Sequence, residues 1–267
     1  MIRARIRPEI NSARLLALKL DSLRSLLARI TVLVFLTSCG PTASPPTSGQ
    51  GGATAPPTLR PLQTCIQAGD MAQEVAFPST KGEQVVGAVL GSGDVGIVLA
   101  HQVQSDLCEW VPYAERLRDM GRRVLVFDFG LDLAGDVVGA AAELRREGVA
   151  KVVLVGGSMG GTASLVAASI ITPTIAGVAS LSGPADFSQM DALVASKQLT
   201  VPVLYMAAEK DEERFPSDAR AMYAVCPSGH KRLLILPGND HGSELLTGNV
   251  ANQARSALEM FIAQVVA

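Results

Sequence analysis

Three polar residues that could take part in nucleophilic catalysis each follow a short apolar segment. The first is Ser158, in Gly156-Gly157-Ser158-Met159-Gly160, which matches the pattern G-x-S-x-G. In this pattern a sharp turn between a strand and a helix exposes the serine hydroxyl, and glycines leave the space that Cβ atoms would fill. Apolar residues precede the motif and small residues follow it. We therefore expect Ser158 to be a nucleophile; a glycine-rich turn that serves packing alone is the other interpretation.

A nucleophilic serine needs a base, and near neutral pH the base is most often a histidine. The chain has three histidines, at positions 101, 230 and 241. His241 lies in Pro237-Gly238-Asn239-Asp240-His241-Gly242, directly after the apolar segment 232–236. His230 precedes that segment, so we expect it in solvent at the opposite edge of the sheet. We expect His241 to be the base; a histidine in a surface loop is the alternative.

A carboxylate is needed to hold the histidine in the correct tautomer and to stabilise the imidazolium. Asp211 follows the apolar segment 203–206, and it is our candidate for this role. Glu209 and Glu212 compete with it, and an ordinary charged loop is the simpler interpretation. The chain order of serine, aspartate and histidine is the order expected for one fold type.

The dipeptide His101-Gln102 directly follows the apolar segment 96–100. This resembles the loop after the third strand that, in proteins with the G-x-S-x-G turn, supplies a second backbone N–H group to the oxyanion. We expect the N–H groups of Gln102 and Met159 to form an oxyanion hole, in which each donor is typically worth about 3 kcal/mol. His101 is expected to support this loop, and it is the base only if the register is different.

These residues must be positioned by elements that alternate between apolar strands and helices. Such alternation favours a mostly parallel, doubly wound α/β sheet, in which ligands bind beyond the carboxyl ends of the strands. The strands are expected at 73–79, 84–90, 96–100, 123–127, 151–155, 175–181, 201–206 and 232–236. The helices are expected at 110–120, 137–147, 161–169, 186–198, 217–225 and 250–266.

Composition excludes several classes of protein. The chain has 267 residues, 23 Lys+Arg and 25 Asp+Glu, which suits a single α/β domain. The near-neutral charge and the lack of a basic stripe argue against a nucleic-acid partner. No apolar run reaches about 18 residues, which excludes a polytopic membrane protein. No Cys-x-x-Cys pair occurs, and we expect no metal and no cofactor.

The N-terminal part has the pattern of an export signal. Residues 1–29 carry seven basic and two acidic side chains, and the short apolar run 30–36 follows. Next comes Leu36-Thr37-Ser38-Cys39, which resembles the bacterial lipobox, in which the cysteine is acylated and becomes the new N-terminus. We therefore expect residues 1–38 to be a lipoprotein signal peptide and Cys39 to be lipidated. A plain secreted protein or an amphipathic helix is the alternative.

Residues 39–61 are rich in Gly, Pro, Ser and Thr, so we expect a lipidated flexible tether ahead of a domain that spans 62–267. Removal of residues 1–38 leaves 16 basic against 23 acidic side chains, so lipid rather than a basic surface must attach the protein to the outer face of the cell membrane. Export would place Cys65, Cys108 and Cys226 in an oxidising compartment. They allow one disulfide and one free thiol, in any of three pairings.

The segment from about Val75 to the C-terminus resembles the α/β-hydrolase superfamily, in its small serine-esterase and dienelactone-hydrolase-like branch. The resemblance rests on five features in order, namely Leu99-Ala100-His101-Gln102, Val124-Leu125-Val126-Phe127-Asp128, Gly156-Gly157-Ser158-Met159-Gly160, Asp211 and Asp240-His241-Gly242. It implies at most eight strands and a Ser158–His241–Asp211 triad. Dienelactone hydrolases proper carry a cysteine nucleophile, and this chain has a serine. Only residues 182–200 are available for a lid, so the site should be open.

The resemblance implies hydrolysis of a small or medium carboxylic ester or thioester through an acyl-enzyme. The expected partners are therefore a small-molecule ester and, through the lipid at Cys39, a membrane. A serine peptidase is a lesser alternative, because no acid that would bind an amine is evident. A tethered binding lipoprotein that has lost catalysis is the alternative from another class.

Overall fold

The computed structural model describes residues 65–66, 72–212 and 214–267. The expectations for the signal peptide, the tether and the lipidated Cys39 fall outside these residues. All described residues belong to one compact unit. Within the described ranges, none of the helices combines the length and the apolar character that a membrane crossing requires.

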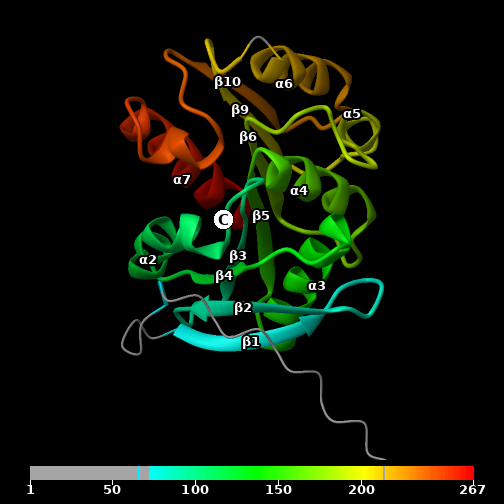
Figure 1. The fold of residues 1–267 in the computed structure, drawn as a ribbon, viewed down its shortest axis with the longest axis vertical. Helices are drawn as coiled ribbons and strands as arrows, with labels where there is room; N and C mark the ends of the chain where they lie inside the picture. Colours follow the sequence, from blue (N-terminus) through cyan, green and yellow to red (C-terminus); the bar gives the residue numbers. More distant parts are fainter. Residues whose placement is uncertain (1–64, 67–71, 213) are drawn as a thin grey trace, which may run out of the picture. The chain divides into compact units, whose positions relative to one another are not determined.

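The centre of this unit is an eight-stranded sheet in the order β1-β2-β4-β3-β5-β6-β9-β10 (Figure 1). The first strand pairs antiparallel with the second, and the second pairs antiparallel with the fourth. All remaining neighbours are parallel, which confirms the mostly parallel, doubly wound sheet. The strands are β1 (Ala72–Pro78), β2 (Gln84–Leu90), β3 (Val95–Ala100), β4 (Arg123–Phe127), β5 (Lys151–Gly157), β6 (Gly177–Leu181), β9 (Val203–Ala208) and β10 (Lys231–Leu236).

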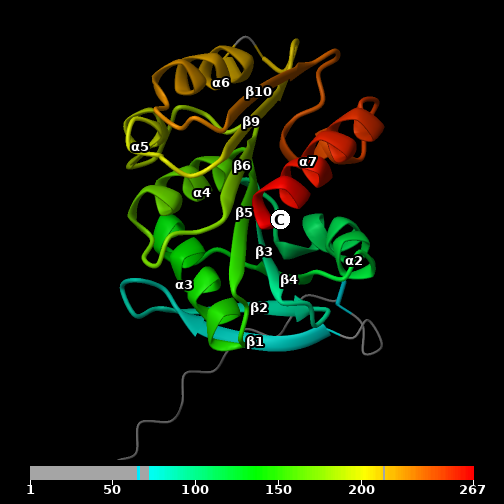
Figure 2. The same cartoon turned by 180° about the vertical axis from the view of Figure 1, so that it is seen from behind.

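Helices cover both faces of the sheet (Figures 1 and 2). One apolar core packs α3 (Leu133–Arg146), α4 (Met159–Ile170), α5 (Ala192–Ser196) and α6 (Arg214–Val225) against one face. The other core packs α2 (Val111–Asp119) and α7 (Ala251–Val266) against the opposite face. Every residue of β3 and of β9 is buried, as expected for central strands that are covered on both sides.

The segment after β6 differs from the sequence prediction. The helix expected at 186–198 is a short hairpin of β7 (Asp186–Phe187) and β8 (Met190–Asp191), followed by α5. The Asp191 carboxylate accepts a hydrogen bond from the N–H of Val194 at 2.7 Å, which caps α5 and delays its start. The helix expected at 137–147 also begins earlier, at Leu133. Between β6 and β9 the chain forms only this hairpin and α5, so no sizeable lid is present in the described part.

The cysteine pairing that the sequence left open is resolved. Cys65 and Cys108 form a disulfide, with a Cα–Cα distance of 5.7 Å. Cys226 is free and buried. The disulfide joins the chain ahead of β1 to the short 3₁₀ helix η1 (Leu107–Trp110), which follows the loop after β3.

Candidate active site

Ser158 lies at the turn between β5 and α4, as the G-x-S-x-G pattern predicts. Its backbone has φ 48° and ψ −117°, an unfavourable conformation for a residue with a Cβ. The turn is held on both sides, because the N–H of Ser158 donates to the carbonyl of Leu181 and its own carbonyl accepts from the N–H of Thr162. The side chain is largely buried, with 6% of the residue exposed.

The glycines of this turn allow close backbone approaches. A Cβ at Gly156, near the end of β5, would lie 2.2 Å from the carbonyl group of Gly160, in the first turn of α4. A Cβ at Gly160 would lie 2.2 Å from the carbonyl oxygen of Ala100, at the end of β3. Real Cβ atoms essentially never come closer than 3.0 Å to such atoms. The motif therefore packs the start of α4 directly onto the end of β3, where the expected oxyanion loop begins.

His241 and Asp211 form a hydrogen-bonded pair. Nδ1 of His241 lies 2.8 Å from Oδ1 of Asp211, whose side chain is 3% exposed. Burial lowers the pKa of His241, but the hydrogen bond and charge of Asp211, together with Glu212 and Glu244, outweigh it and raise the pKa above its usual value. The ring of Phe215, at the start of α6, packs beside the imidazole, with 4.4 Å between the two ring centroids.

The loop that carries His241 lies against the serine turn. A Cβ at Gly242 would lie 3.5 Å from the N of Ser158, and a Cβ at Gly157 would lie 3.0 Å from the N of Ser243. The fold therefore brings the three candidate residues, which are separated by 30 to 83 positions in the sequence, to one edge of the sheet. Their roles in catalysis stay predictions.

The competing candidates occupy other environments. Glu209 and Glu212 are exposed, and the histidine hydrogen bond goes to Asp211. His230 is exposed next to the amino end of β10, as expected. His101 has both ring nitrogens engaged: Nε2 accepts from the N–H of Phe129 at 3.2 Å, so Nδ1 donates to the carbonyl of Gln102 at 2.8 Å. These bonds are those of a loop support.

The two expected oxyanion donors differ in their surroundings. The N–H of Met159 is in the first turn of α4, where backbone donors have no partner within the helix. The N–H of Gln102 donates to Oε1 of Glu109 at 3.3 Å. For Gln102 to serve an oxyanion, this N–H must be shared with or released from Glu109. Its role as a donor stays a prediction.

Unusual backbone conformations gather at this edge of the sheet. Among the described residues other than glycine, five have a positive φ, and all lie in segments that follow the carboxyl ends of β3, β5, β6 or β9. They are Gln104, Ser158, Ser182, Ser188 and Glu212. Such conformations cost about 1–3 kcal/mol each and persist where the surrounding structure imposes them, often at functional sites.

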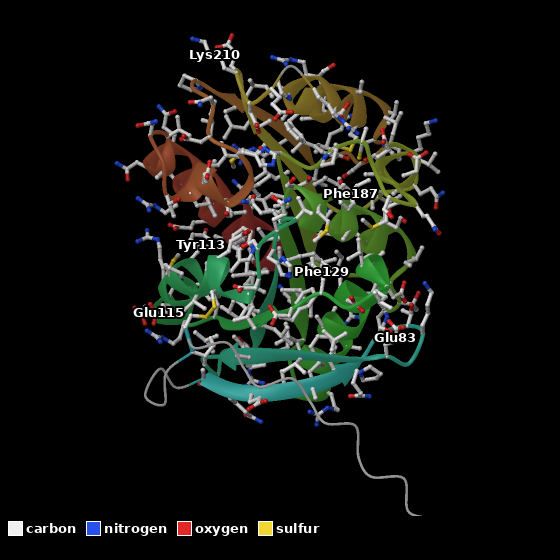
Figure 3. The ribbon with its side chains drawn as sticks, in the orientation of Figure 1. Glu83, Tyr113, Glu115, Phe129, Phe187 and Lys210 are labelled. Atoms are coloured by element: carbon white, nitrogen blue, oxygen red, sulfur yellow. A yellow bond between two sulfur atoms is a disulfide. The ribbon has the colours of Figure 1, made fainter. Side chains whose placement is uncertain are left out.

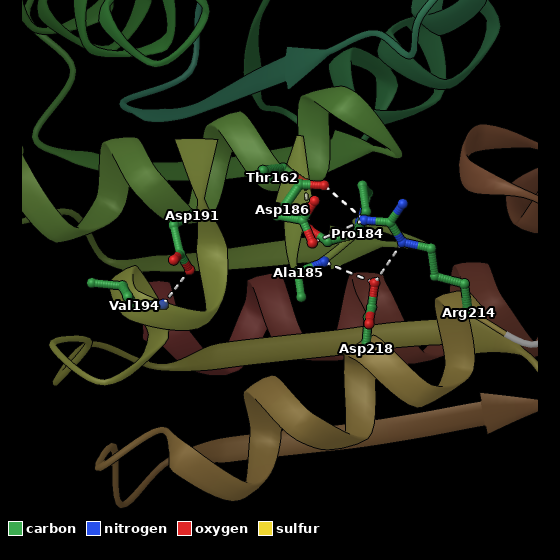
Figure 4. Close-up of polar contacts among 8 residues, drawn as sticks. All are labelled: Thr162, Pro184, Ala185, Asp186, Asp191, Val194, Arg214 and Asp218. Atoms are coloured by element: carbon green, nitrogen blue, oxygen red, sulfur yellow. Dashed lines mark hydrogen bonds and ion pairs between the residues drawn. The ribbon is translucent and has the colours of Figure 1, made fainter. Parts of the chain in front are cut away.

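A polar network fixes the segment after β6 beside the segment that follows Asp211 (Figure 4). Arg214 pairs with Asp218 at 3.1 Å and with Asp186 at 3.1 Å. Asp218 also accepts from the N–H of Ala185 at 3.0 Å, and Thr162 of α4 donates to the carbonyl of Pro184 at 2.6 Å. Figure 3 labels Phe187, the last residue of β7, and Phe129, which follows β4. The network ties the start of α6, three residues after Asp211, to the segment after β6.

Two residues near the site were not found by the sequence analysis. Glu109 precedes a buried tryptophan in η1, and no motif marks it as a partner of Gln102. Phe215 lies four positions after Asp211, and only its place at the start of α6 brings it to His241. Among the described residues, no group of three or more His, Cys, Asp or Glu side chains is arranged to hold a metal ion.

Comparison of the chain with protein-family models and with curated protein sequences found no match. Solved structures are similar. An esterase from Pyrococcus furiosus, Pf2001, has a TM-score of 0.63 and 14% identity, over 72% of this chain and 92% of that one. The esterase domain of a Rhodothermus marinus protein has a TM-score of 0.58 and 21% identity, over 72% and 97% of the two chains. A dienelactone hydrolase from Anabaena variabilis has a TM-score of 0.58 and 24% identity, over 72% and 98%.

These neighbours share the mostly parallel central sheet with helices on both faces. At identities of 14–24% the likeness establishes the fold and leaves the activity to be argued from the site. The strand order, the serine turn after β5 and the histidine loop after β10 agree with it. The described chain has the α/β-hydrolase fold.

Proposed function

We propose that this protein is a serine hydrolase that cleaves small or medium carboxylic esters or thioesters through an acyl-enzyme. One observation carries the proposal: His241 is hydrogen-bonded to the buried Asp211 at 2.8 Å, and the loop that carries His241 packs against the strained turn of Ser158. A nucleophile, a base and an orienting acid at one strand edge form the arrangement that activates a serine.

The hydrogen bond of His241 supports a route for each proton in the proposed reaction. Nδ1–H of His241 donates to Asp211, so Nε2 carries a lone pair and can accept the proton of Ser158. In the proposed reaction the serine oxygen then attacks the ester carbonyl, and the N–H of Met159, in the first turn of α4, stabilises the oxyanion. His241 gives the proton to the leaving alcohol. A water molecule that gives a proton to His241 then attacks the acyl-enzyme, and His241 returns this proton to the oxygen of Ser158 as the carboxylic acid leaves.

The substrate class follows from the small cover of the site. Only the β7–β8 hairpin and the five-residue α5 lie between β6 and β9, so little of the described chain encloses a long acyl group. Esterases and a dienelactone hydrolase among the structural neighbours support ester chemistry. We therefore propose short or medium acyl chains.

Hydrolysis of short-chain aryl esters by the purified protein tests the proposal. Ser158→Ala should lower the rate by about 10³–10⁶-fold and leave the protein folded. A folded Ser158→Ala protein that keeps full activity would contradict the assignment. Acyl-chain length can then be scanned from two carbons upward, and the rate should not rise with the longer chains, because little of the described chain is available to bind the added carbons.

We also propose that the protein is exported and anchored to the outer face of a bacterial membrane by lipid at Cys39. The lipobox-like sequence motivates this, and the Cys65–Cys108 disulfide supports it because such bonds persist in oxidising compartments. Labelling of producing cells with radioactive palmitate tests it. The protein should take up the label, and Cys39→Ser should abolish it; equal labelling of both proteins would contradict the anchor.

A further inference from the structure

The Glu109 carboxyl group lies beside the loop after β3, which forms part of the candidate site. Its Oε1 accepts the N–H of Gln102, in the loop after β3, at 3.3 Å. Burial is the largest influence on this carboxyl group and raises its pKa above the usual value, against the lowering effects of Ser105, His101, the backbone of Gln102 and Ser243. Oε2 is buried and has no hydrogen-bond partner among the described residues.

The turn that carries Glu109 is firmly held. The Asp106 carboxylate caps η1 by accepting the N–H of Cys108 at 2.9 Å. The N–H of Leu107 donates to Asp128 at 2.8 Å, Trp110 is 1% exposed, and Cys108 is joined to Cys65. These contacts limit the movement of η1, so the Glu109 carboxyl group is a fixed acceptor for the loop that bonds to it.

The loop after β3 and the loop that carries His241 are in close contact with each other and with the serine turn. A Cβ at Gly242 would lie 2.2 Å from Oε1 of Gln102 and 3.5 Å from the N of Ser158. A Cβ at Gly157 would lie 3.0 Å from the N of Ser243. A displacement of either loop is therefore transmitted to the serine turn and to the neighbour of His241.

We propose that Glu109 is a positioning residue, which holds the loop after β3 through Gln102 and, because Gln102 contacts Gly242, keeps the serine, the histidine and the N–H of Met159 in register. The inference rests on the proposed hydrolase function. Glu109 does not reach the reacting atoms itself. Its loss should reduce kcat, because a shift of about 1 Å in a catalytic group can lower the rate by about 10²-fold. KM should change little, because the open surface that receives the ester is unaltered.

Two variants separate this role from simple stability. Glu109→Ala removes the link. Glu109→Gln keeps one acceptor oxygen for the N–H of Gln102 and replaces the other carboxyl oxygen by an NH₂ group. Glu143→Ala is the matched control, since Glu143 is an even more deeply buried acid (5% exposed) and is bonded to Arg146 near the end of α3, away from the candidate site. Each protein is assayed for aryl-ester kcat and KM and for the rate of labelling by a fluorophosphonate.

Glu109→Ala should lower kcat and the labelling rate at least tenfold, with KM within about twofold. Glu109→Gln should restore kcat to within about threefold of the parent, and Glu143→Ala should keep the parent kcat. If Glu109→Ala does not fold, Glu109→Asp, which withdraws the acid by one methylene, should show the same loss beside the restored Gln variant.

Any one of the following results would overturn the role. An unchanged kcat in folded Glu109→Ala removes it, and an increased kcat means that the carboxyl group competes with the oxyanion. A kcat as low in Glu109→Gln as in Glu109→Ala shows that the acceptor oxygen is not what matters. A parent protein with neither turnover nor labelling overturns the proposed function and this role together, whereas a labelled parent with an unaffected Glu109→Ala variant overturns this role alone.

Discussion

Gly160→Ala is the most informative single substitution at the serine turn. The added Cβ would lie 2.2 Å from the carbonyl oxygen of Ala100, 2.6 Å from its carbonyl carbon and 2.7 Å from the carbonyl oxygen of His101. All three atoms belong to the backbone at the end of β3, so no side chain can rotate away. The start of α4 must move by about 0.8 Å to reach the 3.0 Å that real Cβ atoms tolerate.

This movement separates Ser158 and the N–H of Met159 from the loop after β3. A displacement of about 1 Å costs about 10²-fold in rate, so kcat for a short aryl ester should fall by about 10²-fold. Overpacking should also lower the free energy of unfolding by about 1–3 kcal/mol. Urea unfolding measures the second effect separately from the first.

Gly229→Ala is the matched control, because a Cβ there meets no atom within 4 Å and its φ is not positive. Its kcat should stay within about twofold of the parent. A folded Gly160→Ala protein with kcat within threefold of the parent would refute the reasoning, since the helix start would then have shifted without any effect on the reaction, or the reaction would not occur there.

Three further predictions concern the histidine, its acid and the disulfide. The kcat/KM should rise with pH through a midpoint above 6.5, because His241 must be neutral to act as base and its pKa is raised; a midpoint below 6.5 would contradict the pairing. Asp211→Asn should lower kcat by about 10⁴-fold, as measured with the same ester, and a loss below tenfold would argue against Asp211. Replacing Cys65 and Cys108 by serine opens a loop with a sequence separation of 43 and should lower the free energy of unfolding by up to about 4 kcal/mol in urea titrations. No measurable loss would argue against the disulfide.

The sequence predicted the sheet because its central strands are short apolar runs that end at glycine or polar residues. It also placed Ser158, Asp211 and His241 at strand ends, and the fold brings these ends to one edge. Parallel strands connected by helices must end on the same side, so local patterns were sufficient there.

Features held by distant contacts could not be predicted in this way. The hairpin at 186–191 replaces an expected helix, and its contacts come from a distant segment: Arg214 binds the backbone and the side chain of Asp186, and Asp218 accepts from the N–H of Ala185 just before the hairpin. The partner of Cys108 depends on a distance in space that spacing along the chain does not reveal. Glu109 carries no motif, and its link to Gln102 is a contact between a 3₁₀ turn and a loop.

Fluorophosphonate labelling, followed by mapping of the modified peptide, tests the central claim most directly. The parent protein should take up one phosphonyl group, located on Ser158, and the uptake should disappear in Ser158→Ala and slow strongly in His241→Ala. A folded parent protein that takes up no phosphonyl group, or takes it up at another residue, would contradict the assignment of Ser158 as an activated nucleophile and would favour a tethered binding protein with this fold.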